Sequence, residues 1–167
     1  MIEIRRYDET KWVATTVEAQ ARNSRSSSSS MFNKLFDYIS GKNSQNKKIA
    51  MTAPVTTIFK NAGNNLITLD SRCQMSMRFY IPKEFHQNTP QPTGDAYLQT
   101  DAETVVASIR FGGFASMSDN IKYRDILIRA LGTEARRYDT VNMMTAGYDS
   151  PFNLIGRRNE VWLKRID

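Results

Sequence analysis

Few side chains in this 167-residue chain have the types and spacing that catalysis needs. With one histidine, His86, and one cysteine, Cys73, neither a zinc cluster nor a cysteine–histidine pair of recognisable spacing can be built. Residues 111–114 (FGGF) hold only two glycines, too few for a phosphate-binding loop. Among 17 acidic residues, Glu160 lies close to Trp162 near the chain end and keeps one acid–base hypothesis open.

Side chains suited to binding are more frequent, since the chain has eight methionines, eight phenylalanines and seven tyrosines. Methionine adapts its shape and packs well against flat aromatic surfaces. Met31, Met51, Met143 and Met144 occupy corresponding or neighbouring places in the two halves of the chain. We predict that they line one cleft between the halves; the alternative is that each methionine fills the core.

The net charge of +6 is concentrated at the two ends. Residues 1–50 hold nine Lys/Arg against five Asp/Glu, and residues 121–167 hold nine against six. If the fold brings the ends together, their basic surface would suit an anionic ligand such as a carboxylate-bearing small molecule; a solvated basic exterior is the alternative. No zinc spacing, recognition-helix pattern or basic-aromatic motif points to nucleic acid.

Neither a membrane span nor a secretory signal is expected. The chain has no run of ~18 apolar residues, and residues 1–6 (MIEIRR) have no apolar signal core. A single cysteine cannot form an internal disulfide. We therefore expect a cytoplasmic protein.

Two short strings recur at one offset. Met51-Thr52-Ala53 returns as Met144-Thr145-Ala146, and Val13-Ala14-Thr15 falls on Val106-Ala107-Ser108, each 93 residues later. A constant offset indicates a duplicated unit; the alternative is a chance match of common residues. We predict one domain, residues 1–167, built from pseudo-repeats at about 3–81 and 95–166. Each repeat would run strand, helix, strand, strand.

Hydrophobic periodicity and turn residues predict the elements of these repeats. The serine run 26–30 is typical of a flexible loop whose last members cap the helix that follows. Pro54 predicts an edge or bulged position for its strand. The predicted strands are 3–18, 49–59, 73–81, 97–111 (as one strand or two), 140–148 and 160–166, and the predicted helices are 31–40 and 118–131.

Several motifs resemble those of the SOUL haem-binding protein family. They are residues 48–55 (KIAMTAPV), 110–115 (RFGGFA) and 147–151 (GYDSP), followed by 156–163 (GRRNEVWL). They occur in the family's order and span the chain from about Tyr7 to Lys164. The resemblance implies an α+β fold: a distorted antiparallel β-barrel flanked by two helices and built from two β-α-β-β pseudo-repeats.

The resemblance also implies tetrapyrrole binding in an apolar groove beside the first helix, with basic residues near the propionates. His86, in the proline-rich crossover, is the candidate axial ligand; the alternatives are a Met or Tyr ligand, or no strong protein ligand. The implied ligand is haem or metal-free porphyrin. The predicted binding residues are Met31, Lys34, Leu35, Tyr38, Met51, Met144, Arg157 and Arg158.

The first hypothesis is thus a non-enzymatic haem or porphyrin binder that acts as a carrier or buffer. A second is a binding module for other flat amphipathic molecules. A third is an enzyme that uses the same cleft with Glu160 as acid or base. A fourth is an interaction protein whose second helix, over residues 127–134, docks in a partner's groove.

Overall fold

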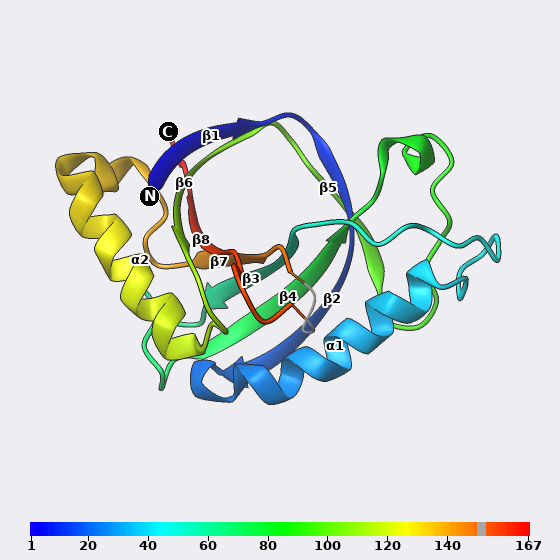
Figure 1. Ribbon diagram of the computed structural model, residues 1–167, viewed down its shortest axis with the longest axis horizontal. Coiled ribbons are helices and arrows are strands. Elements are labelled where there is room, and N and C mark those ends of the chain that lie inside the picture. The colour runs from blue at the N-terminus through cyan, green and yellow to red at the C-terminus, as the bar shows by residue number, and fades with distance from the viewer. Residues whose placement is uncertain (150–152) are drawn as a thin grey trace.

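One antiparallel sheet of eight strands curves into a half-barrel, and two long helices cover its convex face (Figure 1). The computed structural model describes residues 1–149 and 153–167. The predicted α+β fold with a distorted barrel and two flanking helices is confirmed. The strands are β1 (Ile2–Tyr7), β2 (Thr10–Gln20), β3 (Val55–Asn61), β4 (Arg72–Tyr80), β5 (Tyr97–Asp101), β6 (Thr104–Phe111), β7 (Met143–Gly147) and β8 (Asn159–Lys164). The α-helices are α1 (Ser24–Ile39) and α2 (Met117–Leu131), and the short 3-10 helices are η1 (Ala21–Asn23), η2 (Lys83–Phe85) and η3 (Gly132–Arg137).

The strand order, β1-β6-β8-β7-β3-β4-β2-β5, reveals the two repeated units. Exchanging β1 with β5, β2 with β6, β3 with β7 and β4 with β8 reproduces this order read backwards. In the same way α1 packs on β2 and β4, whereas α2 packs on β6 and β8. Each unit begins with two strands rather than one, because the chain turns at Asp8 and Glu9 between β1 and β2.

The 93-residue offset does not describe this structural repeat. Val13 faces the core under the helices, whereas Val106, its match in sequence, faces the concave side of the sheet beside Trp162. Met51 precedes β3, while Met144 lies inside β7. Because side chains alternate along a strand, a slip of one residue reverses the two faces. The predicted equivalence of Met51 and Met144 is therefore wrong, although the two-unit architecture is present.

Helix α1 includes the serine run that was predicted to be a loop. It begins at Ser24, and the hydroxyls of Ser26 and Ser28 donate to the carbonyl oxygens of Asn23 and Ser24, both at 2.8 Å. Serine favours such local bonds and is a weak helix former. The helix persists because its later turns bury a stripe of apolar side chains against the sheet, and packing outweighs propensity.

Helix α2 begins at Met117, one residue before the predicted range 118–131, and its cap is Ser116. The Ser116 hydroxyl accepts from the Asp119 amide at 3.1 Å, and the Asp119 carboxylate accepts from the Ser116 amide at 3.0 Å. This capping box satisfies two amides that a helix start leaves unpaired. At the other end, Gly132 has φ +56°, which is consistent with the predicted stop.

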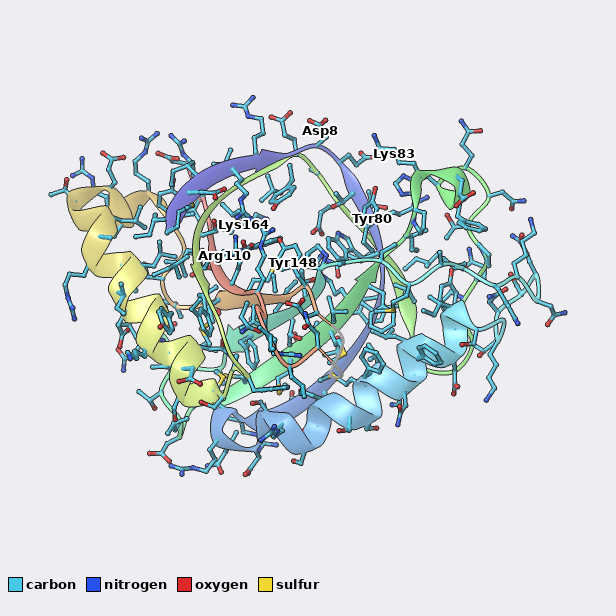
Figure 2. All side chains as sticks on the ribbon, in the orientation of Figure 1. Asp8, Tyr80, Lys83, Arg110, Tyr148 and Lys164 are labelled. Carbon is cyan, nitrogen blue, oxygen red and sulfur yellow. The ribbon has the colours of Figure 1, made fainter. Side chains whose placement is uncertain are left out.

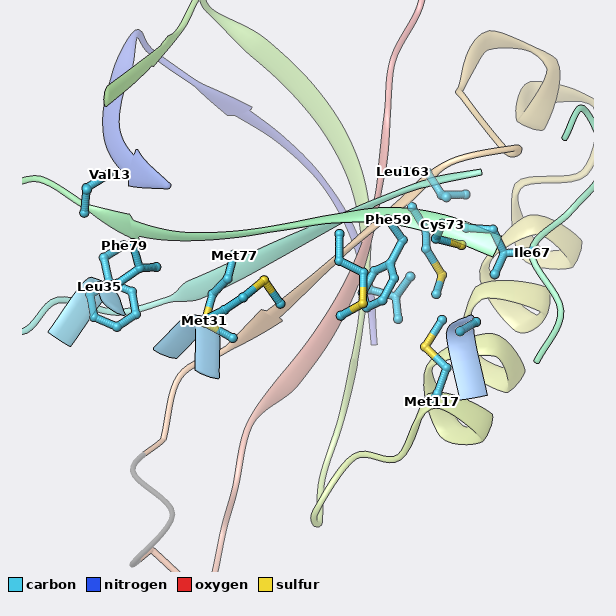
Figure 3. Close-up of a cluster of buried hydrophobic side chains, with 14 of the residues drawn as sticks. Val13, Met31, Leu35, Phe59, Ile67, Cys73, Met77, Phe79, Met117 and Leu163 are labelled. Carbon is cyan, nitrogen blue, oxygen red and sulfur yellow. The ribbon is translucent and has the colours of Figure 1, made fainter. Parts of the chain in front are cut away.

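Strand β3 is central in the sheet, between β4 and β7, so the edge position predicted from Pro54 is wrong. Pro54 lies just before β3 and therefore removes no bond from its ladder. The apolar core fills the space between the sheet and the two helices, with Met31, Phe59 and Met117 among its members (Figure 3). No helix within the described residues is long and apolar enough to cross a membrane.

Candidate functional site

A groove of about 430 Å³ runs beside α1, where the segment before β3 and the end of β7 approach the helix. Phe36 and Met51 on its walls are 48% and 46% exposed. The ring of Phe32 stacks on that of Phe36 at 6.1 Å and meets Phe79 edge-on at 5.1 Å. Large apolar side chains gathered in an open groove mark a binding surface. The described lining residues are Phe32, Phe36, Met51, Thr52, Ala53, Val55, Gly147, Tyr148 and Asp149.

Three predicted groove residues lie in the core instead. Met31 and Leu35 are fully buried, and Tyr38 is 2% exposed (Figure 3 shows Met31 and Leu35 against the sheet). The Tyr38 hydroxyl donates to the Pro90 carbonyl oxygen at 2.6 Å, and burial raises the pKa of Tyr38 to about 12. The helix positions that follow Met31 and Leu35, occupied by Phe32 and Phe36, line the groove.

The methionines do not share one cleft. Met51 lies in the groove beside α1, whereas Met144 lines cavities on the concave side of the sheet. Met31 and Met143 belong to the core. The prediction of one cleft is wrong because it relied on the 93-residue offset, which does not match the structural repeat.

The three predicted basic residues have different surroundings. Lys34 Nζ lies 2.7 Å from an Asp95 carboxylate oxygen, and this hydrogen bond lowers the pKa of Asp95. Arg158 binds Glu160. The guanidinium of Arg157 lies 4.1 Å from the centre of the Phe114 ring, and its Nη1 donates to the Asn153 carbonyl oxygen at 3.0 Å.

Arg157 also lines a basin of about 620 Å³ that shares Gly147 with the groove. Arg22, just before α1, and Arg25, in its first turn, line the same basin. Three guanidinium groups therefore line the basin that adjoins the groove, and that of Arg22 is paired with Asp70. The segment 150–152, which includes Ser150 and Pro151 of the predicted motif, lies outside the described residues.

Glu160 is fully buried and, within the part of the chain that the structure describes, accepts hydrogen bonds from four side chains. Arg5 donates to both carboxylate oxygens at 2.7 Å, and Arg158 donates to one of them at 3.1 and 2.9 Å. Trp162 Nε1 and the Tyr148 hydroxyl donate at 2.9 and 3.0 Å. Burial alone would raise the pKa of Glu160, but these bonds outweigh it and lower the pKa to about 2.

This cluster determines the orientation of Tyr148, a groove residue labelled in Figure 2. The Arg158 guanidinium lies 4.1 Å from the centre of its ring, while its hydroxyl binds Glu160. Burial is also the main cause of the raised pKa of Tyr148. Glu160 and Arg158 were predicted separately; their contacts with Tyr148 and Arg5 depend on the pairing of β7 with β8 and of β6 with β8 and β1.

His86 lies outside the groove. Its Nε2 lies 2.6 Å from the Ile81 carbonyl oxygen and donates a hydrogen bond to it. Its ring meets Tyr80 edge-on at 5.9 Å. Within residues 1–149 and 153–167, no group of three or more His, Cys, Asp or Glu side chains could hold a metal ion.

Solved structures with this fold have little sequence in common with the chain. The C-terminal domain of EcmrR superposes with a TM-score of 0.65 at 12% identity, covering 100% of this chain and 98% of that one. A hydrolase from Listeria innocua superposes with a TM-score of 0.62 at 10% identity, covering 99% and 91%. At such low identity these similarities describe the fold alone.

Sequence relatives are more informative. Heme-binding protein 2 from Mus musculus and from Homo sapiens are each 36% identical over 162 residues, covering 96% of this chain and 76% of the relative. Heme-binding protein 1 from Xenopus tropicalis is 33% identical over 161 residues, covering 96% and 81%. The family model described as SOUL heme-binding protein matches residues 1–164. The chain therefore belongs to the SOUL heme-binding protein family.

Proposed function

We propose that this protein binds haem or a related tetrapyrrole in the groove beside α1 and acts as a carrier or buffer rather than as a catalyst. The observation that carries the proposal is the pair of half-exposed apolar side chains, Phe36 and Met51, on the walls of one groove. A flat ring that covered these side chains would remove apolar surface from water. This burial would stabilise the complex by roughly 25 cal/mol per Å². Family membership supports the choice of ligand.

Different residues would contact the ring of the ligand and its propionates. Phe32 and Phe36 present stacked aromatic rings, and the Met51 thioether is a polarisable partner for a flat ring. Arg157, in the adjoining basin, is the basic residue best placed for propionates. Lys34 and Arg158 do not line this basin, and they bind Asp95 and Glu160.

Haem would supply a redox-active iron, but the groove offers that iron weak ligands. The Tyr148 hydroxyl donates to Glu160, and burial raises its pKa, so the phenolate that iron prefers is disfavoured. Met51 supplies a thioether, which is a weaker ligand than histidine or thiolate. Ring burial would therefore provide most of the affinity, which we expect to be micromolar, about 8 kcal/mol.

A haemin titration of the Phe36→Ser variant, followed by Soret absorbance, tests the site. We expect haemin affinity to fall by about tenfold or more while the fold survives, because Phe36 is already half exposed. Leu66→Ser is the matched control, since Leu66 is 42% exposed and does not line the groove. Equal haemin affinity in both variants would place the site elsewhere.

The catalytic alternative lacks support from the geometry of Glu160. A general acid or base works best when its pKa lies near the operating pH. The pKa of Glu160 is about 2, and its oxygens are bound by four side chains. Binding of other flat amphipathic molecules remains the second candidate, because the groove's contacts are apolar.

The buried free thiol of Cys73 supports cytoplasmic residence.

A further inference from the structure

A second cavity, of about 260 Å³, lies on the concave side of the sheet, opposite the face that the helices cover. Both tryptophans of the protein line it, Trp12 from β2 and Trp162 from β8. Tyr7 stacks on Trp162 at 5.2 Å with an interplanar angle of 26°, and Tyr80 meets Trp12 edge-on at 5.6 Å. Its walls therefore present aromatic rings of the kind that stack on other flat aromatic groups.

Arg78 provides a polar group in this aromatic cavity. Its side chain is 1% exposed, and its guanidinium lies 4.2 Å from the centre of the Trp12 ring. Nε donates to the Thr56 hydroxyl at 3.1 Å, and Nη1 donates to Asp101 at 2.6 Å. Among the described residues, the partner of Nη2 is the Met144 sulfur at 3.7 Å. A thioether is a weak acceptor, so Nη2 keeps most of its capacity to donate.

A buried donor with a weak partner raises the free energy of the protein, and a stronger acceptor from a ligand would remove that cost. The charge of Arg78 is already compensated by Asp101. Asp8, exposed at the rim, disfavours an anion, while the buried guanidinium disfavours a cation. The electrostatics of the cavity therefore favour a neutral ligand.

Size separates this cavity from the groove beside α1. Its volume lies below the usual range for drug-sized ligands, roughly 300–1,000 Å³, which suits one bicyclic ring rather than a tetrapyrrole. A neighbouring cavity of about 250 Å³ shares Met144 and Trp162 and could take a substituent. We propose that the concave cavity is a second, separate ligand site that takes a small, neutral, planar aromatic molecule whose hydrogen-bond acceptor binds Arg78 Nη2.

Calorimetric titration with two bicyclic probes tests this proposal. Coumarin carries a carbonyl acceptor, whereas naphthalene has a similar shape and none. We expect coumarin to bind with a Kd of about 0.1 mM, within the ceiling for a ligand of its size, and at least tenfold more tightly than naphthalene. In a ¹H–¹⁵N NMR spectrum the indole resonances of Trp12 and Trp162 should shift with coumarin. Saturating haemin should leave the calorimetric coumarin affinity unchanged.

Three results would overturn the proposal: equal affinity for the two probes, indole resonances that do not move, or competition between coumarin and haemin. Competition would mean one shared site. If the wild-type protein bound coumarin but not haemin, only the tetrapyrrole proposal would be contradicted. The two proposals therefore fail independently.

A cavity-filling variant provides the matched test. Thr104→Trp places an indole in the cavity from β6, a strand position that tolerates aromatic residues. Glu103→Trp is the control, because Glu103 is exposed and adjacent but does not line the cavity. We expect T104W to lose coumarin binding by at least tenfold and to keep haemin binding, and E103W to keep both. If T104W does not fold, the wild-type probe comparison and the haemin competition decide.

Discussion

The two terminal nitrogens of Arg5 each lie 2.7 Å from one carboxylate oxygen of Glu160, which is 155 residues further along the chain. The pair joins β1 to β8 across β6, since both strands pair with β6. A bidentate contact of this kind is stronger and more directional than a single charged hydrogen bond. Because Glu160 also binds Tyr148, the same pair supports one wall of the groove beside α1.

This ion pair predicts a particular acid sensitivity. The folded-state pKa of Glu160, about 2, lies below its ordinary value of 4.5. The associated stability is therefore present above pH ~4.5 and is lost as the pH falls towards 2, by roughly 3 kcal/mol. Urea unfolding of the wild type between pH 7 and pH 2.5 should show this loss, and Glu160→Gln should flatten it while lowering stability at pH 7. Glu103→Gln, at an exposed site, is the control. Parallel pH profiles for wild type and E160Q would contradict the account.

Met31 and Met51 should give opposite effects when they are shortened. Met31→Ala should lower the free energy of unfolding by about 2–5 kcal/mol, because it leaves a cavity in a fully buried core. Met51→Ala should change stability by less than about 1 kcal/mol, because Met51 is half exposed, and should weaken haemin binding. Urea unfolding and Soret titration of both variants measure the two effects. A stable M31A with reduced haemin affinity would return Met31 to the groove.

The strands and α2 could be predicted from sequence because their apolar positions alternate or recur at helical spacing between clear turn residues. The serine run before Met31 could not, because its helical state depends on packing rather than on serine's own preference. The boundary at Asp8 and Glu9 was also missed, since β-favouring residues follow on either side.

A groove does lie beside the first helix, where the ligand site was predicted, but Met31, Leu35 and Tyr38 are buried and do not line it. Its role as the ligand site stays a prediction. Leu35 and Phe36 are adjacent and both apolar, so periodicity alone could not decide which of them faces the sheet. The ion pair of Arg5 with Glu160 left no signal in one sequence, because the partners meet only through the order of the strands. The buried Arg78 was missed for the same reason.

Arg157 should contribute to haem affinity through charge. Arg157→Gln should weaken haemin binding by about tenfold, the value of one charge-assisted bond. The affinity of the Arg157→Gln variant for protoporphyrin dimethyl ester, in which the propionates are uncharged, should match that of the wild type. Lys34→Gln is the control, since Lys34 is paired with Asp95. An equal loss for acid and ester would mean that Arg157 acts on the structure of the loop instead.

The central claim is that ring burial in the groove beside α1, rather than iron ligation, holds the tetrapyrrole. Parallel titration of the wild-type protein with haemin and with iron-free protoporphyrin IX tests it most directly. The account predicts micromolar dissociation constants, about 8 kcal/mol, that agree within about tenfold. Loss of binding on removal of the iron would contradict it and would make His86→Ala the variant that identifies the ligand.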